Sequence, residues 1–96
     1  MSRFKLALAQ MPVIGGQPGE NLRNAVDQVA AAARSGAAVV LLPEALDCGW
    51  CHASARELAG PIPDGEACLR LREAARTHSI HVCAGLIERA GDRLFN

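Results

Sequence analysis

An acidic residue directly behind an apolar run is the feature of this sequence best suited to chemistry. Residues 37–42 are uninterrupted apolar positions, Pro43 stops the run, and Glu44 follows it. Short apolar runs with β-branched members are typical of strands buried on both faces. Open α/β sheets place their reactive groups just outside the carboxyl ends of such strands. We therefore expect Glu44 to be a catalytic group, although acids at this position also serve as helix caps or solvated loop residues.

A second candidate for chemistry is the segment Cys48-Gly49-Trp50-Cys51-His52. Its spacing is shared by attachment sites for c-type haem and by thiol–disulfide redox pairs, and it could contribute to a zinc site. Haem attachment requires export, and a zinc site requires a second ligand pair, for which the other cysteines and histidines have no clean spacing. A redox pair formed by Cys48 and Cys51 stays open as an alternative. Otherwise both are free thiols in a variable loop, with Trp50 packed over the sheet or lining a pocket.

Composition and charge exclude several classes of partner. The chain has 96 residues, which allows one domain, and ten acidic residues balance ten basic ones. Without a basic stripe interleaved with aromatic residues, we expect neither nucleic acid nor a membrane surface as a partner. The apolar stretch behind Arg3 and Lys5 is too short for a secretory signal. We expect a cytoplasmic protein whose four cysteines are free thiols.

The elements that must position these residues alternate between strands and helices. Residues 4–10 predict a central strand with two apolar faces, followed by a loop rich in glycine and proline. Apolar residues at helical spacing from Leu22 to Ala33 predict a helix that ends at Ser35-Gly36. The buried strand that ends at Leu42 comes next.

The second half of the chain repeats this alternation. Residues 45–63 predict a long loop with a short helix near 53–58, and Asp64 is expected to cap a second long helix. Residues 80–87 predict a buried strand, in which Gly85 indicates a bulge or a close backbone approach. Residues 89–92 predict a turn, and residues 93–96 begin a further strand. Cys68 and Cys83 are interpreted as small buried hydrophobic residues. The pattern indicates an α/β fold.

The ordered set of these segments resembles the amino-terminal part of the nitrilase, or carbon–nitrogen hydrolase, superfamily. Lys5–Gln10 resembles the opening strand of that family, and Gly36–Glu44 resembles the strand that ends in its catalytic glutamate. Gly60–Gly65 resembles the loop before its next helix. Gly85–Arg89 and Arg93–Asn96 resemble its next strand and hairpin. The resemblance implies part of an α-β-β-α sandwich, and it implies that residues 1–96 are the amino-terminal portion of such a domain, cut after Asn96.

The resemblance also implies a reaction and a site. Family members hydrolyse small amides, nitriles or carbamoyl compounds through a glutamate, a lysine and a cysteine, without a metal or an organic cofactor, and they form homo-oligomers. Glu44 matches the glutamate, which acts as the general base on the cysteine thiol. The matching lysine and cysteine are expected beyond Asn96, so the 96 residues alone are expected to be inactive. A non-enzymatic α/β binding or assembly module is the alternative, and a dithiol redox protein built on Cys48 and Cys51 is a weaker one.

Overall fold

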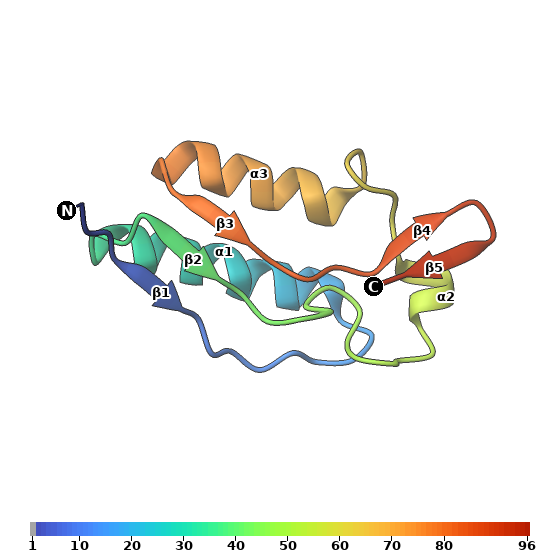
Figure 1. Ribbon diagram of the computed structural model, residues 1–96. Coiled ribbons are helices and arrows are strands. Elements are labelled where there is room, and N and C mark those ends of the chain that lie inside the picture. Colours follow the sequence, from blue (N-terminus) through green and yellow to red (C-terminus); the bar gives the residue numbers. More distant parts are fainter. Residues whose placement is uncertain (1) are drawn as a thin grey trace.

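Three short parallel strands form the sheet that leads to Glu44. A computed structural model describes residues 2–96, and its strands β1 (Leu6–Leu8), β2 (Val39–Leu41) and β3 (His81–Cys83) lie in the order β1-β2-β3. The strands are in register, so that Ala7 pairs with Val40 and Val40 pairs with Val82. Because all three run in the same direction, their carboxyl ends meet at one edge of the sheet (Figure 1).

Two helices cover one face of this sheet. Helix α1 (Pro18–Arg34) follows β1, and helix α3 (Glu66–His78) precedes β3. They pack against each other and against the sheet, as Figure 1 shows. The short helix α2 (Ala55–Leu58) lies beyond the carboxyl ends of the strands, beside an antiparallel hairpin of β4 (Glu88–Ala90) and β5 (Arg93–Phe95). No helix in residues 2–96 is long and apolar enough to cross a membrane.

The ends of α1 follow from local chemistry. Proline in its first turn costs no hydrogen bond, because the first amides of a helix have no partner within it. Gly36, whose φ is +86°, terminates the helix in the left-handed region that glycine adopts without strain. The amides of Gly36 and Ala37 then donate to the carbonyl oxygens of Ala33 and Ala32. The predicted end of this helix is confirmed.

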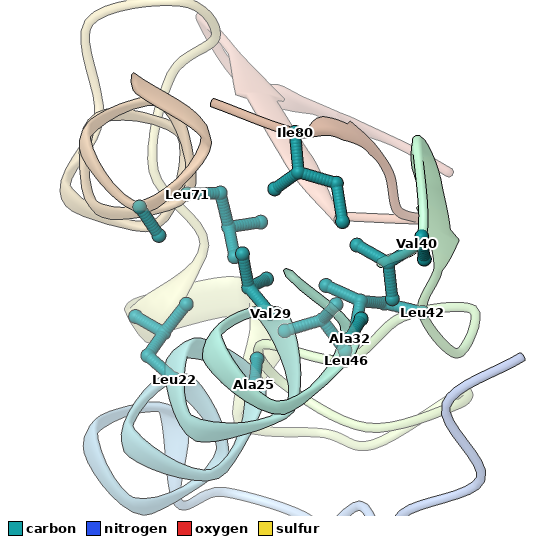
Figure 2. Packing of buried hydrophobic residues seen from close by; sticks show 11 residues of the cluster. Leu22, Ala25, Val29, Ala32, Val40, Leu42, Leu46, Leu71 and Ile80 are labelled. Carbon is teal, nitrogen blue, oxygen red and sulfur yellow. The ribbon is translucent and has the colours of Figure 1, made fainter. Parts of the chain in front are cut away.

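The hydrophobic core lies between the two helices and the covered sheet face. Figure 2 shows Leu22 and Val29 from α1, Leu71 from α3 and Val40 from β2 as members of one buried cluster. Val29 and Val40 are fully buried. The residues from α1 lie at helical spacing, which places them on one stripe and explains why the periodicity identified this helix correctly.

The opposite face of the sheet is uncovered in residues 2–96. Phe4 is 72% exposed, and Leu6, Leu8 and Leu41 are also exposed. Strand β1 has β2 as its single partner in residues 2–96, and so lies at an edge of the described sheet, whereas residues 4–10 predicted a central strand. The apolar pattern of a strand indicates which of its faces can be buried, but it does not indicate which other strands pair with it. Cys83 is exposed because its side chain is on this uncovered face, so its interpretation as a buried residue is wrong.

Two further expectations need correction. The strand expected over residues 80–87 ends at Cys83, and Glu88–Ala90 forms the separate strand β4. Asp64 does not cap α3: Gly65 occupies the capping position, and no side chain donates or accepts there. The amide of Gly65 donates instead to the carbonyl oxygen of Pro61, at 2.8 Å, so that a tight backbone turn leads into the helix.

Candidate active site

Glu44 lies where the sequence predicted it, immediately beyond the carboxyl end of β2. Its side chain is exposed, and its carboxylate oxygen Oε1 accepts a hydrogen bond from Nδ2 of Asn96. Asn96 follows β5, so this contact joins the end of the sheet to the hairpin across 52 residues of sequence. An exposed carboxylate held by one neutral donor keeps free lone pairs, which a proton acceptor needs.

The backbone around Glu44 is a tight turn. Residues 44–48 form consecutive turns, and Ala45 is fully buried with a φ of +50°, in the left-handed region that costs a non-glycine residue about 1–2 kcal/mol. Backbone strain of this kind persists only where the surroundings hold it in place. The amide of Leu46 donates to the carbonyl oxygen of Gly85 at 3.0 Å, and the amide of Gly85 donates to the carbonyl oxygen of Pro43 at 3.3 Å.

A cavity of about 620 Å³ lies beside this turn. Its walls come from the loop before α2, from α2 itself, and from the end of the hairpin. The lining includes Trp50, Arg56, Ile87, Phe95 and Asn96. Glu44 does not line the cavity, but Asn96 both lines it and donates to the Glu44 carboxylate. The size and the mainly apolar lining with a few polar groups are typical of small-molecule sites. Trp50 lines a pocket, which was one of its two expected positions.

Two buried polar side chains hold the loop that follows Glu44. Asn21, fully buried at the start of α1, donates through Nδ2 to the carbonyl oxygen of Asp47 at 3.0 Å. The carboxylate of Asp47, itself 3% exposed, accepts from the amide of Ile87 at 3.1 Å. These contacts connect α1, the Glu44 turn and the segment before β4. Every buried polar side-chain atom in residues 2–96 has a partner.

The surroundings of Cys48 and Cys51 differ from those of a typical redox centre. Burial and the adjacent Asp47 carboxylate raise the pKa of the Cys48 thiol to about 11. Redox-active thiols need a lowered pKa, because the thiolate is the reactive form. Cys51 is exposed, and α2 begins only at Ala55, so no helix amino terminus lies directly behind Cys51. These observations argue against the dithiol alternative.

The histidine of the same motif has a structural role in the described fold. Nδ1 of His52 accepts from the amide of Ser54 at 3.2 Å, and the ring lies against the backbone of Gly15 and Gly16. A side chain at Gly15 would collide with this ring and displace His52 from its present position. Residues 2–96 contain no group of three histidine, cysteine or acidic side chains that could hold a metal ion.

Lys5 is far from Glu44 along the sheet. It precedes β1, whereas Glu44 follows β2, so the two residues belong to opposite ends of parallel strands. Its Nζ donates to the carbonyl oxygen of Ser35 at 2.7 Å, where α1 ends. The lysine therefore satisfies a free carbonyl group at a helix terminus, and it does not contribute a cation to the candidate site.

Sequence reasoning missed Asn21, Asp47 and Asn96 as parts of the site. Asn21 stands just before the apolar stripe of the predicted helix, and Asp47 lies within the predicted loop over residues 45–63. The sequence feature that could have identified Asn21 and Asp47 is a polar residue next to apolar ones: an asparagine beside Leu22, and an acid between Leu46 and Cys48. Polar residues that are buried must find partners, which makes such positions candidates for linking loops.

The fold and the site define an α/β protein with an acid at the carboxyl edge of its parallel sheet and a small-molecule cavity beside it. Residues 5–96 match the family model for carbon-nitrogen hydrolase. A protein named nitrilase from Pyrococcus abyssi is 34% identical over 95 residues, which cover 96% of this chain and 36% of that protein. The chain belongs to the carbon-nitrogen hydrolase family.

Animal relatives give the same result. The protein named omega-amidase NIT2 from Mus musculus is 36% identical over 97 residues, which cover 100% of this chain and 34% of that protein. Its namesake from Danio rerio is 37% identical over 97 residues, with the same two coverages. The chain thus spans about a third of the length of the curated relatives that it matches. A parallel sheet flanked by helices agrees with part of the α-β-β-α sandwich that the resemblance implied.

Proposed function

We propose that this chain is the glutamate-bearing part of an enzyme that hydrolyses small amides, nitriles or carbamoyl compounds, with Glu44 as the general base. The observation that carries the proposal is the hydrogen bond between Asn96 and Glu44, because it links a carboxylate at the strand ends to the wall of a cavity. The family match supports the class of reaction, and the names nitrilase and omega-amidase among the relatives support small carbon–nitrogen compounds as substrates.

The chemistry assigned to Glu44 is proton transfer. The carboxylate accepts the proton of a cysteine thiol while the sulfur forms a bond to the substrate carbon. For an amide, the carbon–nitrogen bond then breaks, ammonia or an amine leaves with the proton, and an acyl thioester stays on the enzyme. A water molecule, deprotonated by the same carboxylate, hydrolyses the thioester. The resemblance assigns the cysteine, and the lysine that stabilises the oxyanion, to sequence beyond Asn96, and it requires no metal or organic cofactor.

The surroundings of Glu44 suit this role. Free lone pairs on an exposed carboxylate can reach a thiol supplied by another segment, and Asn96 fixes one of the two oxygens. The cavity has room for a molecule of a few carbon atoms, and Trp50 and Phe95 are among the side chains that line it. Arg56 and Asn96 add polar groups that can orient such a molecule.

Association and compartment are further parts of the proposal. The apolar side chains Phe4, Leu6, Leu8 and Leu41 are all exposed on or next to strands β1 and β2, which supports burial of this region in the complete enzyme. We expect homo-oligomers of the full-length gene product, measurable by light scattering after size-exclusion chromatography. Four unpaired cysteines support a reducing compartment, and so a cytoplasmic enzyme.

The test of Glu44 is the isosteric substitution Glu44→Gln in the full-length gene product. Loss of the base is expected to lower kcat about 10²–10⁴-fold, with KM changed much less. The glutamine side chain keeps the shape of the glutamate, but its amide group cannot accept the thiol proton. Glu57→Gln is the matched control, since Glu57 is also exposed and lies in α2 without lining the cavity. Equal rates for the Glu44→Gln and Glu57→Gln enzymes would refute the assignment.

The continuation of the reading frame separates the enzyme from the non-enzymatic binding module. The hydrolase proposal requires a lysine and then a cysteine within the next several tens of residues beyond Asn96. If the encoded continuation has neither, the binding or assembly module becomes the better interpretation. In that case the cavity beside Trp50 remains a binding site, and Glu44 has no proton to accept.

A further inference from the structure

We infer that Gly85 and Asp47 are positioning residues that fix Glu44 for proton transfer. This inference rests on the proposed function, since it assigns to two residues a role in placing the general base. Neither residue contacts the cavity, and neither is a candidate for proton transfer itself. Both act on the turn that begins at Glu44, through the segment that leads from β3 to β4.

The first observation is a row of contacts between two backbone segments. The amide of Leu42 donates to the carbonyl oxygen of Cys83 at 2.8 Å, which continues the pairing of β2 with β3. The next contacts join Gly85 to both Pro43 and Leu46. Glu44 and Ala45 lie between these two anchors. They form a small protrusion from the paired backbones, and Glu44 is at its start.

The second observation is the close approach at Gly85. A Cβ atom added there would lie 2.9 Å from Cα of Glu44 and 3.2 Å from the amide nitrogen of Ala45. Carbon atoms pack at about 3.5–4.0 Å, so any side chain must push the two backbones apart by about 0.6 Å or more. Gly85 has no left-handed φ, so the requirement for glycine comes from contact with Glu44 and not from its own backbone conformation.

The third observation is the buried carboxylate of Asp47. Its two oxygens lie 3.1 and 3.3 Å from the amide of Ile87, and Asn21 donates to its carbonyl oxygen from the other side. Asp47 thus ties the far end of the Glu44 turn to the residue two positions beyond Gly85. Because Ala45 is held at a φ of +50°, the turn needs anchors at both ends to persist. Gly85 is bonded on both sides of Glu44 and Ala45, through Pro43 and Leu46, and Asp47 holds the far end of the turn.

The test compares Gly85→Ala with Gly60→Ala in the full-length gene product. Gly60 is the matched control, because a Cβ atom there would meet Cα of Gly65 at 3.6 Å, an ordinary contact. A misplacement near 1 Å can lower a rate about 100-fold, so Gly85→Ala is expected to lower kcat by about that factor and to change KM less than about threefold. Crystal structures of both variants should show the Glu44 backbone displaced by about 0.6 Å in the first and unmoved in the second.

A second pair of variants covers the case in which Gly85→Ala does not fold. Asp47→Asn keeps an oxygen that accepts from Ile87, whereas Asp47→Ala removes it. We expect Asp47→Ala to lower kcat about tenfold or more, and Asp47→Asn to restore most of the rate. If Asp47 had only a structural role, Asp47→Ala would lower stability, but it would not lower kcat while leaving KM nearly unchanged.

The outcomes distinguish this inference from the proposed function. If Glu44→Gln is as active as the wild type, the proposed function fails, while the crystallographic displacement still tests the positioning by Gly85. If Glu44→Gln is inactive but Gly85→Ala and Asp47→Ala both match Gly60→Ala in kcat, the positioning inference is overturned. An unmoved Glu44 in the Gly85→Ala structure overturns it as well.

Discussion

Replacing Asn21 by alanine tests whether one buried side chain holds the loop that carries Glu44. Asn21 makes three hydrogen bonds: Oδ1 accepts from the amide of Ile14 at 2.9 Å, and Nδ2 donates to the carbonyl oxygens of Ile14 and Asp47 at 2.8 and 3.0 Å. The side chain is fully buried. Its removal therefore affects the loop before α1 and the turn behind Glu44 together.

The size of the effect follows from where each partner lies. The two Ile14 groups are partly buried and can be hydrated after the substitution, so each lost bond costs about 0.5–1.5 kcal/mol. The Asp47 carbonyl is buried and stays without a partner, which costs about 1–3 kcal/mol more. We expect Asn21→Ala to reduce the free energy of unfolding by about 2–6 kcal/mol. Domains of this size have about 5–15 kcal/mol in total.

Urea denaturation of the full-length gene product measures this loss, together with hydrogen exchange at the Ile14 amide. With a slope of about 1–3 kcal/mol per molar urea, the midpoint is expected to fall by about 0.7 M or more. Asn24→Ala is the matched control, because Asn24 lies one turn further along α1 and its side chain makes no hydrogen bond in the described structure. If the two variants unfold within about 0.5 kcal/mol of each other, the reasoning is refuted.

Three further predictions concern thiols and the helix end. With iodoacetamide at pH 8, exposed Cys51 should be alkylated much faster than Cys48, whose thiol is buried with a pKa of about 11, and equal rates would contradict the burial. The pKa of the Cys48 thiol is higher in the folded state than its ordinary value of 9.0, so its contribution to stability is complete below pH 9 and is lost as the pH rises toward 11. Cys48→Ala should therefore reduce the fall of the unfolding free energy between pH 9 and pH 11. Gly36→Ala places a side chain at a φ of +86° and should destabilise the fold by about 1–2 kcal/mol in thermal unfolding, whereas Gly19→Ala, in the first turn of α1 and without a positive φ, should not.

The sequence by itself determined the elements with strong local signals. The apolar stripe from Leu22 onward and the glycine at position 36 were sufficient for α1, because helix periodicity and termination depend on neighbours within a few residues. The apolar run before Pro43 was sufficient for β2 and for the position of Glu44 at a strand end. The glycine at position 85 indicated a close backbone approach, and Glu44 is the residue that approaches it.

Tertiary structure decided which distant residues meet. The contacts that surround Glu44 span 26, 40 and 52 residues of sequence, from Asn21 to Asp47, from Asp47 to Ile87, and from Glu44 to Asn96. No local pattern encodes such pairs, because each depends on the order of the strands and on which sheet face the helices cover. The same reason explains why β1 pairs only with β2 in residues 2–96 and why residues 84–87 leave the sheet to pair with the Glu44 turn. The position of the acid is a local property of the chain, whereas its orientation depends on packing between segments far apart in sequence.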